Sequence, residues 1–170
     1  MRWLIDGYNV IRRDPDLRAS EAQGLEAGRK ALLSLIAGIA RRSADRFTVV
    51  FDGAPVPGPA TASGQLEVVF SRPPQKADDI LVTLARQEGD GAVVVTSDRA
   101  IQDAAHRAHC AVLGVDEFLA GLMAPGEEAG RGEKDGEDEE ARAQPKRGNP
   151  RRLSKEARAA QRALRRLRPR

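Results

Sequence analysis

The sequence predicts an α/β fold with a central, mainly parallel sheet covered by helices, in residues 1 to about 125. Short apolar runs that end in polar or Gly-rich turns alternate with segments of helical period, as strands and helices do when they follow one another. Two of the runs, 47–51 and 93–96, contain no polar alternation, which indicates strands buried on both faces. This order suits right-handed crossovers between parallel strands.

Five apolar runs are the predicted strands. They are Trp3 to Ile5, Phe47 to Phe51, Leu66 to Phe70, Ala92 to Thr96 and Ala111 to Leu113. Between the second and third, the stretch 53–64 contains three prolines and is expected to be a loop, because proline interrupts both helices and ladders.

The predicted helices lie between these strands. Ser20 and Gln23 have the spacing of a capping box, which predicts a helix that runs from there to about Arg42. Its buried face is expected to hold Leu25, Leu32, Leu35, Ile36 and Ile39. Further helices are expected over Ala77 to Gln87, Asp98 to Ala108 and Asp116 to Met123.

The composition limits the class of protein. With 170 residues, the chain has room for one ordinary domain and a tail. Its single cysteine, Cys110, excludes an internal disulfide and a Cys-rich zinc framework, and we interpret it as a small buried hydrophobe. Asp6 interrupts the apolar run that a signal peptide would need, and no 18-residue apolar stretch follows. We therefore expect a soluble cytoplasmic protein without a membrane segment.

Charge is distributed unevenly along the chain. Residues 127–142 carry a net charge of −5 and residues 143–170 a net charge of +10, which leaves −2 for residues 1–126 of the total of +3. The acidic segment 126–150 has almost no apolar residues and is expected to be a disordered linker. In residues 151–170, apolar side chains recur at spacings of four, three, four and three, which predicts a basic amphipathic helix with Ser154 as its N-cap. The apolar positions are Leu153, Ala157, Ala160, Leu164 and Leu167.

This basic helix has two compatible interpretations. Its cations could bind the phosphate backbone of RNA or of a ribonucleoprotein without sequence specificity. Alternatively, the apolar stripe docks on the domain or on a protein partner, and the cations form its solvated face. On the first interpretation, which the charge favours, the RNA-binding residues are Arg151, Arg152, Lys155, Arg158, Arg162, Arg165 and Arg166.

Carboxylates follow the ends of several predicted strands. Asp6 ends the first strand, Asp52 the second, and Asp98 lies just beyond the run VVVT. Ligands of open α/β sheets bind outside the carboxyl ends of such strands. Asp78 and Asp79 stand in the first turn of a helix and would reach the same edge if that helix begins there.

Each of these aspartates also has a purely structural interpretation. Aspartate before glycine, as at Asp52, is common in turns, and aspartate near a helix start, as at Asp78 and Asp98, is favoured by capping and by the helix dipole. Their coincidence at one edge favours a shared site. Carboxylates that converge repel one another unless a cation binds, and oxygen-only ligands suit Mg²⁺ or Mn²⁺. Asn9 could orient a water or a phosphate.

Four motifs together resemble the YacP-like group of NYN domains within the PIN-like nuclease superfamily. They are LIDGYNVI at 4–11, VVFDGAPVPG at 49–58, ADD at 77–79 and VVVTSDRAIQ at 93–102. The resemblance extends over residues 3 to about 122, and the RRL and LRRLR patterns of 150–168 resemble the C-terminal end of that group more weakly. The acidic stretch 126–140 departs from the family pattern and resembles an insertion.

The resemblance implies a three-layer, Rossmann-like, PIN-like domain that cleaves RNA endonucleolytically with Mg²⁺ or Mn²⁺. It implies that Asp6, Asp78 and Asp98 hold the metal that positions the scissile phosphate and deprotonates a water, and that Asn9 acts beside them. Asp52 and Asp79 match acidic positions of secondary importance. The expected substrate is RNA, including ribosome-associated mRNA, and the expected products carry 5′-phosphate and 3′-hydroxyl ends.

Three other interpretations of the sequence are less well supported. A non-catalytic RNA- or ribosome-binding module would be expected to lack the carboxylate set, which is present here. A phosphatase that forms an aspartyl-phosphate needs a second acid two residues after the first, whereas Asp6 is followed by Gly7 and Tyr8. His106 and His109 beside Cys110 superficially resemble zinc ligands, but no fourth ligand has suitable spacing, so we expect surface or partly buried histidines.

Overall fold

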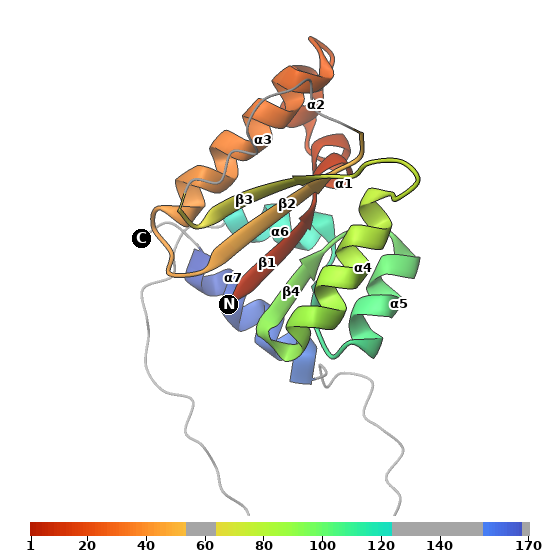
Figure 1. Ribbon diagram of the computed structural model, residues 1–170. Helices are drawn as coiled ribbons and strands as arrows, with labels where there is room; N and C mark the ends of the chain where they lie inside the picture. Colours follow the sequence, from red (N-terminus) through yellow and green to blue (C-terminus); the bar gives the residue numbers. More distant parts are fainter. Residues whose placement is uncertain (54–63, 124–154, 168–170) are drawn as a thin grey trace, which may run out of the picture.

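A five-stranded sheet forms the centre of the computed structural model, which describes residues 1–53, 64–123 and 155–167. All of its paired strands are parallel, in the order β3-β2-β1-β4-β5 (Figure 1). The strands are β1 (Arg2–Asp6), β2 (Arg46–Phe51), β3 (Leu66–Phe70), β4 (Ala92–Val95) and β5 (Ala111–Leu113). The predicted α/β class and the five predicted strands are confirmed.

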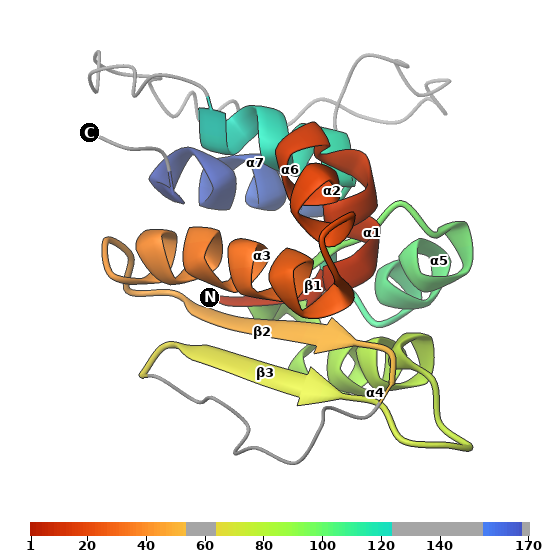
Figure 2. The same ribbon diagram turned by 90° about the horizontal axis from the view of Figure 1, so that it is seen from above.

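Helices cover both faces of this sheet and make three layers. Figure 2 shows α4 and α5 on one side of the sheet and α1, α3, α6 and α7 on the other. The helices are α1 (Gly7–Arg13), α2 (Pro15–Glu21), α3 (Leu25–Ala40), α4 (Ala77–Glu88), α5 (Arg99–Arg107), α6 (Val115–Met123) and α7 (Lys155–Leu167), and a 3₁₀ turn spans Gly89–Gly91.

Alternate side chains of each strand enter two separate apolar cores. On β1, Trp3 and Ile5 belong to the larger core under α3, α6 and α7, whereas Leu4 belongs to the smaller core under α4 and α5. Trp3 is fully buried and packs against the rings of Phe47 and Phe118, at centroid distances of 6.2 and 5.8 Å. Burial on both faces explains why these strands show unbroken apolar runs.

The predicted capping box at Ser20 is wrong. Ser20 lies inside α2, where its hydroxyl donates to the carbonyl of Asp16 at 3.1 Å, and α3 begins only after Gly24, which offers no side-chain cap. Gly24 has a φ of 143°, so the chain turns there in a conformation that favours glycine. Of the positions predicted on its buried face, Leu32, Ile36 and Ile39 are buried and Leu35 is partly buried, whereas Leu25 is 55% exposed.

Two short helices, α1 and α2, were not predicted. Asp14 separates them and caps α2, because its carboxylate accepts the backbone N–H groups of Asp16 and Leu17 at 3.0 and 2.9 Å. Pro15 follows at the first helical position, where its missing N–H costs nothing. The sequence Asp-Pro therefore marks the start of a helix, a signal that was overlooked.

The C-terminal helix α7 is part of the larger core. Its apolar stripe packs against α6 and β5, with Ala160, Ala163, Leu164 and Leu167 all buried. Leu164 fits against Gly121 of α6, where an added Cβ would lie 2.4 Å from a Leu164 methyl carbon. The predicted amphipathic helix is confirmed, and its stripe docks on the domain. The segment 126–150, Arg151, Arg152, Leu153 and Ser154 lie outside the described residues.

Cys110 and the two histidines have the environments expected of them. Cys110 is fully buried, its Sγ donates to the carbonyl of Ala85 at 3.2 Å, and burial raises the pKa of the thiol to about 11. It is therefore an inert thiol at neutral pH. His106 and His109 are exposed. Within the described ranges, no helix combines the length and the apolar character needed to cross a membrane.

Candidate functional site

The carboxyl ends of the parallel strands bring the predicted acidic residues to one edge of the sheet. Asp6 is the last residue of β1, Asp52 follows β2, and Asp98 lies three residues beyond β4. Asp78 stands in the first turn of α4, which begins at the same edge (Figure 1). The edge therefore collects side chains that are far apart in the sequence.

Asp6 is held by three hydrogen bonds. One oxygen accepts the backbone N–H of Asn9 at 3.2 Å, so that Asp6 caps α1. The other oxygen accepts the Asn9 amide at 3.2 Å and the Thr96 hydroxyl at 3.1 Å. Asn9 thus orients Asp6 and forms part of the same local structure.

Gly7 allows the chain to turn directly from β1 into α1. A Cβ at this position would lie 2.3 Å from a ring carbon of Phe51, the last residue of β2. The Phe51 ring is fully buried and cannot move aside easily. The motif Asp-Gly-Tyr-Asn therefore has a packing reason for its glycine as well as a chemical one for its aspartate.

Thr96 links Asp6 to Asp98 and was not predicted as a site residue. It is fully buried, donates its hydroxyl to Asp6, and accepts the backbone N–H of Asp98 at 3.1 Å. Asp98 in turn caps α5 with one oxygen, which accepts the N–H groups of Ala100 and Ile101 at 2.8 and 3.1 Å. The second Asp98 oxygen makes no hydrogen bond within the described part of the chain. The only sequence signal for Thr96 was its place at the end of a buried apolar run.

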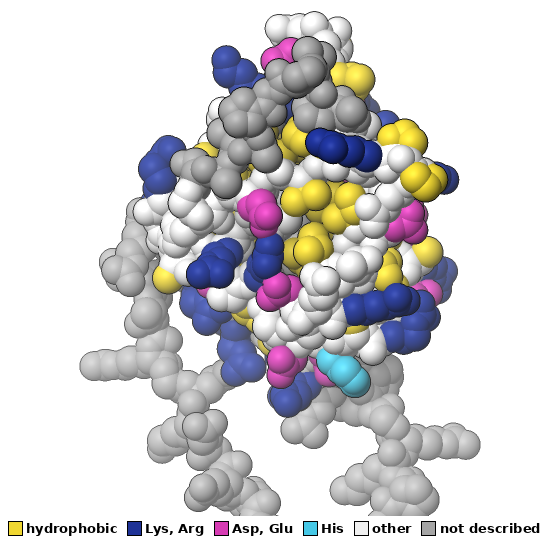
Figure 3. All heavy atoms as spheres, in the orientation of Figure 1, with side chains coloured by type: hydrophobic (Ala, Val, Ile, Leu, Met, Phe, Trp, Pro, Cys, Tyr) yellow, Lys and Arg dark blue, Asp and Glu magenta, His cyan; other side chains and the backbone are white. Residues whose placement is uncertain are grey.

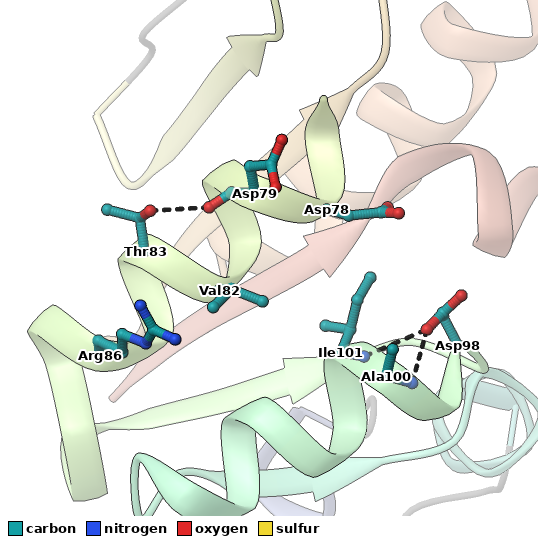
Figure 4. Close-up of a pocket in the computed structure, with 8 residues that line it drawn as sticks. All are labelled: Asp78, Asp79, Val82, Thr83, Arg86, Asp98, Ala100 and Ile101. Carbon is teal, nitrogen blue, oxygen red and sulfur yellow. Dashed lines mark hydrogen bonds between the residues drawn. The ribbon is translucent and has the colours of Figure 1, made fainter. Parts of the chain in front are cut away.

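Asp52 and Asp79 both fix the start of α4. One oxygen of Asp52 accepts the Ser71 hydroxyl at 2.8 Å and the backbone N–H of Ala77 at 2.7 Å. Asp79 accepts the backbone N–H of Lys76 at 3.0 Å, and Figure 4 shows its carboxylate directed away from Asp98. These contacts hold the turn that presents Asp78. Ser71, at the end of β3, was also missed by sequence reasoning.

Asp78 faces an open cleft of about 400 Å³ between α4 and α5. Among the described residues, its carboxylate accepts no hydrogen bond and lies in no ion pair. Figure 4 shows Asp78 and Asp98 on opposite walls of this cleft, with Arg86 towards its other end. The cleft is lined by Asp78, Asp79, Val82, Thr83, Arg86, Asp98, Ala100 and Ile101.

The aspartates act electrostatically on one another. Burial is the main cause that raises the pKa of Asp6, and the charge of Asp98 raises it further, against the hydrogen bonds from Asn9 and Thr96. Burial also raises the pKa of Asp78, followed by the charges of Asp6, Asp98 and Asp52, whereas Lys76 lowers it. Negative charge is therefore concentrated at this edge without full compensation.

The donor set suits a hard divalent cation. Asp6, Asp78 and Asp98 offer carboxylate oxygens at this edge, and their mutual repulsion is a cost that a cation would remove. Within residues 1–53, 64–123 and 155–167, no three His, Cys, Asp or Glu side chains gather closely enough to form a ligand cluster. The fit to a cation therefore rests on ligand chemistry and electrostatics.

A pH dependence of stability follows from the raised pKa values. An acid whose pKa is higher in the folded state adds stability below its unfolded pKa, and this is lost as the pH rises through the folded pKa. In chelator, we therefore expect the Asp78→Asn variant to become more stable than the unsubstituted protein as the pH rises from about 4 to about 7. Urea unfolding across this range measures the difference.

The control for this measurement is Asp103→Asn, which removes an exposed carboxylate on α5. Its stability relative to the unsubstituted protein should stay nearly constant with pH. An equal pH dependence in both variants would contradict the repulsion described for Asp78.

Comparison with known proteins relates this chain to one protein family. The family model for the YacP-like NYN domain matches residues 3–166. The curated protein YacP of Bacillus subtilis (strain 168) is 32% identical over 100 residues, which are 56% of this chain and 59% of that protein. The match thus spans less than two thirds of the relative's length.

Two crystal structures of Rae1 (YacP) from Bacillus subtilis have the same fold. One superposes with a TM-score of 0.60 at 29% identity, and the other, of a variant with one substitution, with a TM-score of 0.59 at 27% identity. Each superposition covers 71% of this chain and 72% of the other.

Proposed function

Because this chain belongs to the YacP-like NYN domain family, whose PIN-like fold is of the nuclease type, we propose that it is a metal-dependent endoribonuclease. The observation that carries the proposal is the set of three aspartates, Asp6, Asp78 and Asp98, at the carboxyl edge of the sheet. Burial and mutual repulsion raise the pKa of the first two. The proposed reaction is hydrolysis of an RNA phosphodiester bond by an activated water.

Asp6, Asp78 and Asp98 are the proposed ligands of Mg²⁺ or Mn²⁺. When bound, such an ion activates water and stabilises charge on a phosphoryl oxygen. Asp78 and one oxygen of Asp98 have no hydrogen-bond partner among the described residues and are available for ligation. Asn9 and Thr96 keep Asp6 in a fixed orientation by their hydrogen bonds.

Asp52 and Asp79 have a different proposed role. Each accepts a backbone N–H at the start of α4, and this contact sets the position of Asp78 in the first helical turn. We assign them to positioning, with direct ligation as a secondary possibility for the oxygens that these contacts leave unused. The product ends expected from attack by water are a 5′-phosphate and a 3′-hydroxyl.

The test of this proposal is incubation of the purified full chain with a structured and an unstructured RNA. Parallel reactions contain Mn²⁺, Mg²⁺ or chelator, and the ends of the products are identified by labelling. Cleavage is expected with at least one of the two ions and not in chelator. Cleavage that persists in chelator would contradict metal dependence, and binding without cleavage would favour a non-catalytic RNA-binding module.

The solvent-facing side of α7 is the second part of the proposal. Its apolar stripe is buried, while Lys155, Arg158, Arg162, Arg165 and Arg166 are exposed. We assign these five cations, with Arg151 and Arg152 beyond the described residues, to non-specific contacts with RNA phosphates. Residues 1–126, whose net charge is only −2, would gain affinity for RNA from this face.

Replacement of two of these cations is expected to weaken RNA binding in a salt-dependent way. The double variant Arg158→Gln, Arg162→Gln should lower the salt slope of binding by roughly 1.4, since each lost contact to a single strand contributes roughly 0.7. Binding is measured in chelator at several salt concentrations.

The matched control removes two exposed cations from other elements, as in Arg42→Gln, Arg107→Gln. If both double variants lower the slope equally, the effect belongs to net charge and the assignment to α7 is wrong.

A further inference from the structure

The guanidinium of Arg29, on α3, lies close to three aromatic rings at one edge of the sheet. The Arg29 guanidinium carbon lies 5.5, 5.9 and 5.4 Å from the ring centroids of Tyr8, Phe51 and Phe70. Its Nε donates to the Tyr8 hydroxyl at 2.7 Å, and Nη2 contacts the same oxygen. Arg29 is therefore held by its contacts with the rings and by hydrogen bonds, although it is only half-buried.

This cation has no carboxylate partner in the described ranges. No Asp or Glu oxygen in these ranges lies within 4.0 Å of the Arg29 guanidinium. The same is true of Arg12, a second cation beside Tyr8, whose guanidinium carbon is 5.6 Å from the Tyr8 ring centroid. Arg2 provides a contrast within the same protein. It is also partly buried, and it is paired with Glu67 at 2.6 Å and Glu88 at 2.7 Å. A fixed and partly desolvated guanidinium without a counter-ion is suited to bind an external anion.

The three rings connect Arg29 directly to the acidic edge. Tyr8 comes two residues after Asp6, Phe51 immediately before Asp52, and Phe70 immediately before Ser71, which holds Asp52. Phe51 and Phe70 are thus the last residues of β2 and β3, and Tyr8 lies in the first turn of α1, which follows β1 directly. The rings that hold Arg29 are therefore next to, or two residues from, Asp6, Asp52 and Ser71 in the sequence.

We propose that Arg29, supported by Arg12, binds a backbone phosphate of the RNA strand next to the site of cleavage. The inference rests on the proposed function and extends it with a substrate-binding subsite. A phosphate is favoured over a stacked base, because the Tyr8 ring already contacts two guanidinium groups and packs edge-on against Phe51 at 5.2 Å. The Nη1 of Arg29 makes no hydrogen bond within the described residues and remains available as a donor.

The subsite also meets an electrostatic need of the proposed reaction. An RNA strand that enters an edge with four aspartates is repelled unless cations receive its other phosphates. A cation held at a fixed distance from Asp6 would also set which phosphate of the strand reaches the carboxylates. Fixed geometry of this kind contributes to positioning the reacting group.

The test compares Arg29→Gln with Lys30→Gln, which removes the same charge from the next residue of α3, an exposed one. Binding of a single-stranded RNA is measured in chelator at several salt concentrations, so that no cleavage is required. Arg29→Gln is expected to weaken binding by about tenfold and to lower the salt slope by roughly 0.7, and Lys30→Gln is expected to change both less.

Two further arms separate the alternatives. Tyr8→Phe keeps the charge of Arg29 and removes its hydrogen-bond acceptor, so an intermediate loss of affinity is expected together with a folded protein. RNAs with a 5′-hydroxyl and with a 5′-phosphate should show the same dependence on Arg29. A dependence confined to the phosphorylated RNA would assign the subsite to a terminal phosphate and overturn the backbone assignment.

The proposal fails if Arg29→Gln, shown to be folded by urea unfolding, binds RNA with the same affinity and salt slope as Lys30→Gln. Arg29 would then only cover the aromatic cluster. This result can be told apart from failure of the proposed function. If RNA binding depends on Arg29 but no cleavage occurs, the phosphate subsite is supported and the nuclease activity is contradicted. If RNA is cleaved but Arg29→Gln changes neither affinity nor salt slope, the nuclease activity is supported and the phosphate subsite is contradicted.

Discussion

Asp6→Asn is expected to reduce RNA cleavage by more than about 100-fold, since substitution even of groups that merely orient metal ligands costs about 10- to 100-fold. Asparagine retains the shape of the side chain and is as good a helix N-cap as aspartate, so α1 should remain folded. The loss should therefore come from one missing negative charge among the three aspartates at this edge of the sheet. Initial cleavage rates in Mn²⁺ and in Mg²⁺ measure it.

Thermal unfolding of the same variant gives an independent readout. Mn²⁺ stabilises the folded protein in proportion to its binding, so the increase in Tm caused by the ion should be largely lost in Asp6→Asn. The Asp103→Asn variant, at an exposed position on α5, should keep both the rate and the Tm increase. A variant at Asp6 that cleaves RNA at nearly the normal rate would remove this residue from the proposed machinery.

Leu164→Ala is expected to lower the free energy of unfolding by about 2 to 5 kcal/mol, the usual range for a buried leucine. The side chain is 5% exposed and packs against Gly121, which has no side chain that could move into the vacated space. Arg165→Ala, at the exposed neighbouring position, should change stability by less than about 0.5 kcal/mol. Urea unfolding of both variants makes the comparison.

The same packing predicts the result of removing α7. If the helix were a separate basic arm, a chain cut at residue 125 would keep its fold and lose only affinity for RNA. In the structure, the cut removes Ala160, Ala163 and Leu167 from the larger core and exposes the apolar side chains of β5 and α6 against which they pack. We expect the shortened chain to be unfolded or strongly destabilised, and a normal unfolding transition would contradict the role assigned to α7.

The sheet could be predicted from the sequence because burial on both faces leaves a direct signal. Unbroken runs such as Phe47–Phe51 are rare outside buried parallel strands, and the acidic residues after them were located by the same reasoning. The helices α1 and α2 were not predicted because the helical period of α3 is the stronger signal in this part of the sequence. The spacing of Ser20 and Gln23 then placed the predicted start of α3 too early. Local capping patterns are weaker evidence than the contacts that decide where a helix begins.

The acidic residues at the sheet edge could be predicted from the sequence, whereas the hydroxyl groups that hold them could not. Asp6, Asp52 and Asp98 were found because strand ends meet at one edge, which topology alone determines. Thr96 and Ser71 act through single hydroxyl groups, and a hydroxyl at a strand end has no distinctive pattern. Arg29 could not be found because its three aromatic partners come from separate segments that only the tertiary fold unites.

The position of α7 also bears on how the chain can vary in length. The larger core contains both Trp3 and Leu167. It is therefore complete only when α7 packs against β5 and α6, and the segment 124–154 connects α6 to α7 in the sequence. The entropy lost on closing such a connection grows only with the logarithm of its length, by about 0.6 kcal/mol for each doubling. Related chains with a much shorter or longer connection could therefore keep the same core, and the acidic stretch can be accommodated at little cost to folding.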